Sequence, residues 1–358
     1  MREIALNGRF LAQGLTGVQR YAAEITRALD QLAGEGRAPL VRLLAPPRAA
    51  APWLANIPVV TVGERSGQGW EQVDLPRAAR GATLVSLGNT GPVLAGKCQA
   101  VVIHDAGAFD TPESYSFAFR SWYRLLQRAL VRRGARIVTV SAFSRGRIAA
   151  HLPVAEAAIA VTLEGGEHIL REPADASVLE RNGLVPGRFA LAVGTRAAHK
   201  NLAALGAASA LLAARGLRLA AAGAADPAVF RPAEGAAGPG AVALGRVSDR
   251  ELRALYEAAL CLVFPSRYEG FGLPPVEAMA AGCPVIAARA GAVPEVCGEA
   301  ALWFDPAEPA SLAAALARLL DEPGLAGRLA EAGRARARAL TWREAAGRLL
   351  EAIAGIGA

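Results

Sequence analysis

The chain has 358 residues, which is enough for two domains of ordinary size. Hydrophobic residues make up 53% of the chain and charged residues 20%, which is typical of a globular protein and excludes a disordered one. The formal net charge of +7 suits nucleic acid, an anionic small molecule or an anionic lipid surface. Because only 6% of residues are aromatic and the arginines are spread along the chain, stacking platforms are scarce, and we expect no nucleic-acid partner.

The sequence also gives indications of the compartment. No apolar run is long enough to span a membrane. The first residues pass directly into a strand and lack the apolar core of a signal peptide. The four cysteines have no C-x-x-C spacing and lie in apolar segments, as buried free thiols do in a reducing compartment. We therefore expect a cytoplasmic protein.

Short apolar runs alternate with helical patterns through the first half, which predicts a parallel α/β sheet. The expected strands cover residues 3–7, 39–44, 59–62, 84–87, 100–103, 137–140 and 159–163. Helices are expected over residues 18–32 and 114–136, and another after Ser141, whose hydroxyl suits an N-cap. Gly14 and Gly17 flank the first helix start, where a phosphate could approach, although loop glycines are usually only turns.

His104 and Asp105 follow the strand 100–103 directly. Ligands bind at the carboxyl ends of strands in open α/β sheets, so His104 is a candidate site residue, although a single histidine is more often structural.

The basic helix 114–136 carries arginines at every fourth position, which places them in one slowly drifting stripe. They are Arg120, Arg124, Arg128 and Arg132. The stripe fits a solvated face, or a surface that contacts anionic membrane lipid with help from the adjacent Trp122 and Tyr123.

The second half repeats the α/β pattern after a connecting segment at residues 170–187. The expected strands begin at residues 189, 217, 242, 262 and 284. Two helices are expected to begin near Asn201 and Ser248, and three more to cover residues 311–320, 326–339 and 342–356. Ser248 and Glu251 have the spacing of a capping box.

Lys200 stands in the loop between a strand and a helix. The chain has two lysines, Lys97 and Lys200, against thirty-seven arginines. A lysine at this position suits a phosphate group, because its ammonium is a compact point charge. The alternative is an ordinary surface lysine.

Residues 262–295 carry the strongest signal. A buried strand, a loop with Gly270 and Gly272, and a helix predicted to begin near Pro275 create an exposed helix N-terminus, which binds anions. Glu269 lies before the loop and Glu277 in the expected first turn. Because carboxylates accept hydrogen bonds from sugar hydroxyls, a nucleotide sugar satisfies all these groups. Alternatively, Glu277 only favours the helix start and Glu269 is a solvated loop residue.

The segment Glu269-Gly-Phe-Gly-Leu-Pro-Pro-Val-Glu277 resembles the E-x7-E motif of retaining glycosyltransferases of family 4, which have the GT-B fold. The flanking Phe264-Pro-Ser266 and Ala278-Met-Ala-Ala-Gly-Cys-Pro-Val285 are similar too. The resemblance implies two Rossmann-like domains facing across a cleft. It also implies sugar transfer from a nucleotide-diphosphate sugar with retained configuration, and neither a metal nor another cofactor.

The same resemblance implies roles for individual residues. Glu269 would hold the donor sugar and Glu277 the ribose, Lys200 the diphosphate, and His104 the sugar or the acceptor, so that His104, Glu269 and Lys200 form the catalytic set. The full implied donor-binding set is Gly17, Arg196, Lys200, Arg246, Val247, Glu269, Gly270, Phe271, Gly272, Leu273 and Glu277. The family usually has a basic residue before the lysine, where this chain has His199, so either Arg196 or His199 supplies the second phosphate contact.

The implied organisation is an acceptor-side domain at residues 1–169, a nucleotide-sugar-binding domain at 170–341, and a crossover helix at 342–358 that packs on the first domain. The whole pattern resembles bacterial mannosyltransferases of surface-polysaccharide biosynthesis, which implies a saccharide or lipid-linked saccharide acceptor at the inner face of the cell membrane. Glucosyl or rhamnosyl transfer from a UDP- or dTDP-sugar, a sugar-nucleotide epimerase and an inactive sugar-binding homologue are the alternatives.

Overall fold

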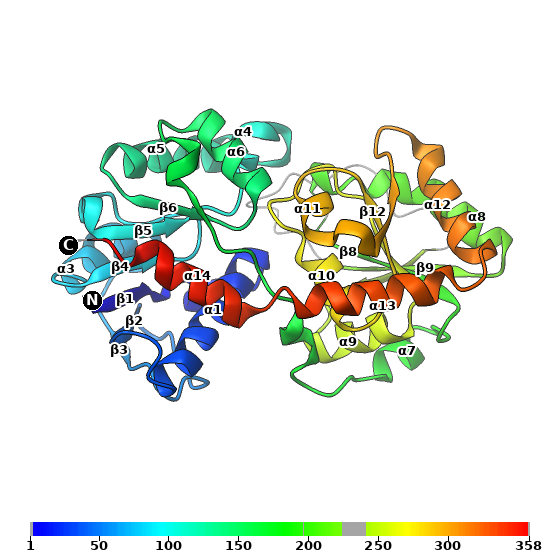
Figure 1. The fold of residues 1–358 in the computed structure, drawn as a ribbon, viewed down its shortest axis with the longest axis horizontal. Coiled ribbons are helices and arrows are strands. Elements are labelled where there is room, and N and C mark those ends of the chain that lie inside the picture. The colour runs from blue at the N-terminus through cyan, green and yellow to red at the C-terminus, as the bar shows by residue number, and fades with distance from the viewer. Residues whose placement is uncertain (1–2, 196, 224–240, 357–358) are drawn as a thin grey trace. The chain divides into compact units, whose positions relative to one another are not determined.

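The computed structural model describes residues 3–195, 197–223 and 241–356. The chain forms two compact units, shown in Figure 1. Unit 1 consists of Met1–Phe109, Arg120–Glu164 and Trp342–Ala358, and unit 2 of Asp110–Phe119 and Gly165–Thr341. Among the described residues, no helix is both long and apolar enough to cross a bilayer.

Unit 1 is built on a seven-stranded parallel sheet with the order β3-β2-β1-β4-β5-β6-β7. Its central strands β1, β4 and β5 are buried along their whole length, as expected for strands covered on both faces, whereas β3 at one edge is exposed. They are β1 Ile4–Asn7, β2 Val41–Ala45, β3 Val59–Thr61, β4 Thr83–Ser86, β5 Gln99–Val102, β6 Arg136–Thr139 and β7 Ala160–Val161.

The helices of unit 1 include the last one in the chain. They are α1 Gly17–Gly34, α2 Gly67–Gly69, α3 Leu75–Ala78, α4 Gly107–Asp110, α5 Phe117–Arg132, α6 Ala142–His151 and α14 Trp342–Ile353, of which α4 and α5 each extend into unit 2. α14 packs beside α1 (Figure 1). It buries Trp342 and Leu349, and the Trp342 ring centroid lies 5.9 Å from that of Tyr21. Ser141 caps α6 by accepting a hydrogen bond from the Ser144 amide, as predicted.

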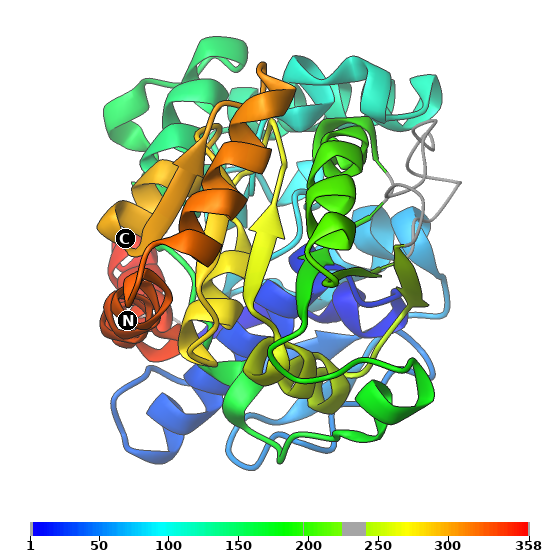
Figure 2. The ribbon, with the colours of Figure 1, turned by 90° about the vertical axis from the view of Figure 1, so that its right-hand side faces the viewer.

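Unit 2 is built on a six-stranded parallel sheet with the order β10-β9-β8-β11-β12-β13. The strands are β8 Phe189–Val193, β9 Arg218–Ala222, β10 Val242–Gly245, β11 Cys261–Phe264, β12 Val285–Ala288 and β13 Ala301–Phe304. The helices are α7 Ser177–Arg181, α8 Leu205–Ala214, α9 Asp249–Ala258, α10 Leu273–Ala280, α11 Val293–Cys297, α12 Pro309–Asp321 and α13 Leu325–Arg338. α8 and α12 lie side by side against the sheet and share one hydrophobic core with it (Figure 2).

The chain therefore consists of two α/β units, each built on a parallel sheet, and the predicted α/β fold class is confirmed. The strand order reverses beside the first strand of each sheet, between β1 and β4 in unit 1 and between β8 and β11 in unit 2. At such a point the loops that leave the two central strands diverge, and the space above their carboxyl ends is where ligands bind.

Three helix starts differ from the predictions, and the first is that of α5, which begins at Phe117 and not at Ser114. α10 begins at Leu273, two residues before Pro275, because Gly272 turns the chain with a φ of 102° and both following prolines fit the first helical turn. α8 begins at Leu205 and not near Asn201, because Asn201 has a left-handed backbone with a φ of 54° that separates two short 3-10 turns. The capping box of Ser248 and Glu251 is present as predicted.

Candidate functional site

Lys200 and Glu269 meet at the strand-order reversal of unit 2. Lys200 follows β8 and Glu269 follows β11, and Lys200 Nζ lies 2.6 Å from Glu269 Oε1. The side chains are 17% and 12% exposed, so the lysine is not the freely exposed residue that a loop position suggests. An ion pair this well shielded from water is stronger than a surface pair and keeps both charged ends at the carboxyl edge of the sheet.

The backbone around both charged residues is fixed by neighbouring loops. The amide of Arg267 donates to the carbonyl of His199 over 2.8 Å, which ties the two loops together. The carbonyl of Glu269 accepts from the amide of Ala292. Gly291 has a φ of 60°, and a Cβ there would lie 2.7 Å from the Glu269 amide nitrogen, so this close approach requires glycine.

His199 lies beside Lys200 and is almost completely buried. Burial, and then the Lys200 charge, lower the pKa of His199 to about 4. The imidazole is therefore neutral at physiological pH and does not add a positive charge for a phosphate. Arg196, the other residue considered for that role, lies outside the described residues.

Glu277 lies in the second turn of α10, not in the first turn as predicted, because the helix begins earlier. Its side chain is 9% exposed. Its Oε1 lies 3.0 Å from His168 Nε2, and its Oε2 accepts a hydrogen bond of 2.9 Å from the hydroxyl of Tyr256. Burial and the nearby Glu277 charge raise the pKa of Tyr256 well above its usual value, so this hydroxyl keeps its proton.

The rest of the predicted donor loop is buried in unit 2. Its residues are Gly270, Phe271, Gly272 and Leu273. Because prolines occupy positions 274 and 275, the start of α10 offers the N–H groups of Gly272 and Leu273 to an anion. Arg246 is exposed and Val247 half-buried in the loop after β10.

The other two predicted site residues belong to unit 1. Gly17 is exposed and begins α1. His104 is buried after β5, with Nε2 2.9 Å from the carbonyl oxygen of Leu87 and Nδ1 3.5 Å from Glu164 Oε1. The Tyr21 ring contacts the imidazole edge-on, so the orientation of His104 is fixed within unit 1.

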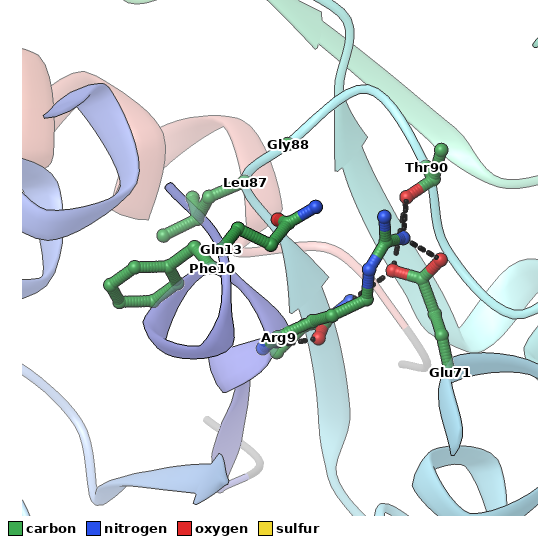
Figure 3. A pocket seen from close by; sticks show the side chains of 8 residues that line it. Arg9, Phe10, Gln13, Glu71, Leu87, Gly88 and Thr90 are labelled. Atoms are coloured by element: carbon green, nitrogen blue, oxygen red, sulfur yellow. Dashed lines mark hydrogen bonds and ion pairs between the residues drawn. The ribbon is translucent and has the colours of Figure 1, made fainter. Parts of the chain in front are cut away.

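A pocket at the strand-order reversal of unit 1 was not predicted from the sequence. It is lined by Asn7, Arg9, Phe10, Gln13, Glu71, Leu87, Gly88 and Thr90. The Arg9 guanidinium points at Glu71 and Thr90 and donates to both, at 2.6 and 2.8 Å (Figure 3). The sequence does contain one indication of this pocket, which is that Arg9 lies two residues after the end of the first strand, beside the first loop.

Among residues 3–195, 197–223 and 241–356, no three His, Cys, Asp or Glu side chains group as ligands of a metal ion would.

Residues 182–336, which include Lys200, Glu269 and Glu277, match the protein family described as Glycosyl transferases group 1. The chain therefore contains a domain of this family. Over 258 residues it is 31% identical to the O-antigen chain mannosyltransferase B of Escherichia coli, covering 67% of this chain and 65% of that protein. Over 94 residues it is 52% identical to the MMP α-(1→4)-mannosyltransferase of Mycolicibacterium hassiacum, covering 25% of this chain and 23% of that protein. The chain thus spans less than two thirds of either relative.

The fold of the chain has counterparts among solved structures. Sucrose-phosphate synthase from Thermosynechococcus elongatus superimposes with a TM-score of 0.71 over 98% of both chains, at 20% identity. This likeness, together with the two parallel sheets, shows the predicted GT-B fold.

We predict that His199 titrates with a pKa of about 4 in the folded protein. Since the unfolded value is near 6.5, the unfolded chain takes up a proton first as the pH falls. Stability should therefore be complete above about pH 6.5 and decrease as the pH falls from there towards 4. NMR titration of the four histidines, assigned with His199→Gln, measures this pKa. A midpoint above about 6 would contradict the neutral state.

Proposed function

We propose that this protein is a retaining, metal-independent glycosyltransferase. It moves a hexose, with mannose favoured, from a nucleotide-diphosphate sugar to a saccharide or lipid-linked saccharide in surface-polysaccharide assembly. The observation that carries the proposal is the meeting of Lys200 and Glu269 at the strand-order reversal of unit 2, beside the start of α10. The preference for mannose rests on the two mannosyltransferase relatives.

In the proposed reaction, an acceptor hydroxyl attacks the anomeric carbon on the face from which the nucleoside diphosphate leaves. Lys200 and the amides of Gly272 and Leu273 stabilise the negative charge that develops on the departing diphosphate. Glu269 accepts hydrogen bonds from the sugar hydroxyls as the ring becomes cationic. In the turn Ala198–Lys200, His199 is neutral and Lys200 is charged. We therefore place the diphosphate on the lysine.

Glu269 has a second role in this proposal. Its carboxylate holds the Lys200 ammonium in place by a hydrogen bond of 2.6 Å. The lysine is therefore positioned before the donor binds, and little reorganisation is needed as the leaving group becomes charged. We place the acceptor side in unit 1, where His104 and the pocket around Arg9 lie at carboxyl ends of strands.

We further propose that the protein acts in the cytoplasm and contacts the inner face of the membrane through α5. Of the arginine stripe, Arg124 is half-buried and its Nε donates to the Ala108 carbonyl, while Arg128 and Arg132 are exposed. Leu125 is 65% exposed and Trp122 39% exposed on the same side of α5. Apolar and cationic side chains on one helical face suit a surface of anionic lipid.

A thermal-shift screen with GDP, UDP, dTDP and ADP tests the proposed donor class. One nucleotide should raise the melting temperature most, because a ligand that binds the folded state stabilises it by mass action. With the matching nucleotide sugar, transfer or slow hydrolysis should persist in excess EDTA. A protein that responds to none of the four nucleotides would contradict the proposal, and activity restored only by magnesium or manganese would contradict metal independence.

Lys200→Ala should reduce turnover about a hundredfold, as removal of one preorganised charge does at an active site. The matched control is Lys97→Ala, which removes the other lysine of the chain from unit 1 and should leave turnover unchanged. Steady-state kinetics with the intact donor measures both variants. If Lys200→Ala retains activity within about threefold, Lys200 does not bind the leaving group.

Cosedimentation with lipid vesicles tests the α5 surface. We expect binding to vesicles that contain phosphatidylglycerol, little binding to phosphatidylcholine alone, and about tenfold weaker binding for Trp122→Ser with Leu125→Ser. Leu40→Ser is the control, because Leu40 is also an apolar residue of unit 1 that is 71% exposed, but it lies before β2 and outside α5. Equal binding of wild type and the α5 variant would show that this helix is not the membrane surface.

A further inference from the structure

Glu277 is held by two side chains that the predicted motif does not include. His168 comes from the 3-10 turn Glu167–Leu170, and Tyr256 from α9. Both are buried, with His168 side chain at 0% and Tyr256 at 0% exposure. Their polar atoms contact different oxygens of the same carboxylate, at 3.0 and 2.9 Å.

The hydrogen atoms of this cluster can be assigned from chemistry. An ionised carboxylate only accepts, so the imidazole Nε2–H and the tyrosine hydroxyl are the donors. Hydrogen bonds to a charged group are about twice as strong as those between neutral groups. Two donors on two oxygens fix the plane of the carboxylate as well as its position.

A glycine allows the turn that carries His168 to approach α10. At Gly166, a Cβ would lie 2.7 Å from the carbonyl oxygen of Val276 and 2.7 Å from its side chain. Only the absence of a side chain permits this contact between the backbones. The close packing next to Glu277 brings His168 within hydrogen-bond distance of the carboxylate.

A carboxylate that was needed only for packing would be a poor choice at this position. Replacing it with an apolar group would remove the desolvation penalty of a buried charge. A carboxylate has about four acceptor positions, so an oxygen that accepts from the protein can also accept from a ligand hydroxyl. The ribose of a nucleotide presents two adjacent hydroxyls to such an acceptor.

We propose that His168 and Tyr256 are positioning residues that orient the Glu277 carboxylate toward the ribose 2′- and 3′-hydroxyls of the donor nucleotide. This inference rests on the proposed function, because it requires a nucleotide at unit 2. It adds a specificity element: the clamp favours ribonucleotides over nucleotides that lack these hydroxyls.

The test compares a ribonucleotide with its dideoxy form. Calorimetry measures the affinities of GDP and 2′,3′-dideoxy-GDP, and of UDP and 2′,3′-dideoxy-UDP, for wild type, Tyr256→Phe, His168→Leu and His168→Gln. Tyr256→Phe and His168→Leu should each lower the affinity for the ribonucleotide about tenfold, the loss expected for one charge-assisted hydrogen bond. They should leave the affinity for the dideoxy form unchanged. His168→Gln, which retains an N–H donor, should restore most of the ribonucleotide affinity.

Two controls separate the possible results. Glu277→Gln should likewise weaken ribonucleotide binding and leave the affinity for the dideoxy form unchanged. Tyr21→Phe, which removes a buried hydroxyl of unit 1, should change neither affinity. If Tyr256→Phe and His168→Leu weaken both nucleotide forms equally, or neither form, the clamp is structural and the inference is wrong. If wild type binds no nucleotide, it is the proposed function that fails.

Discussion

The ion pair between Lys200 and Glu269 depends on the reversal of strand order in unit 2. β8 and β11 are neighbours in the sheet although the chain between them passes through β9 and β10, so their loops meet above the same edge. The 2.6 Å contact keeps the lysine near Phe264, whose ring centroid is 5.9 Å from Nζ. In the proposed function, the donor diphosphate would therefore share the ammonium with Glu269 or displace that carboxylate.

The residue next to Lys200 carries no charge of its own. His199 stays unprotonated at physiological pH because it is buried and because a second cation beside Lys200 is unfavourable. On the other side of the donor loop, Glu277 is fixed by His168 and Tyr256. Unit 2 thus holds a cation and two carboxylates in fixed positions, which is the preorganisation that the proposed nucleotide-sugar donor would require.

Much of the fold follows from local patterns in the sequence. Buried parallel strands are apolar along their length, and runs such as Leu262–Phe264 are visible without a structure. β13 was not predicted, because it is a short run in which Leu302 and Trp303 are only half-buried. The misplaced starts of α8 and α10 have a backbone cause, since helical periodicity does not reveal that Asn201 and Gly272 adopt positive φ angles.

Predictability of the site has a different limit. The spacing of Glu269 and Glu277 and the scarcity of lysine pointed to the donor loop of unit 2. The partners of Glu277 could not be predicted, because His168 is 109 residues away and only the packing at Gly166 brings it close. The same holds for the Arg9 pocket, whose Thr90 is 81 positions from Arg9. The neutral state of His199 depends on burial, which no local pattern gives.

The membership of α14 in unit 1 has a consequence for the order of synthesis. The helix buries Trp342, Ala346 and Leu349 against a unit whose other parts end at Glu164. A ribosome makes all of residues 165–341 before this helix emerges, so unit 2 can fold while unit 1 still exposes an apolar surface beside α1. During that interval, the exposed apolar surface can cause aggregation, and chaperones that bind apolar segments can cover it.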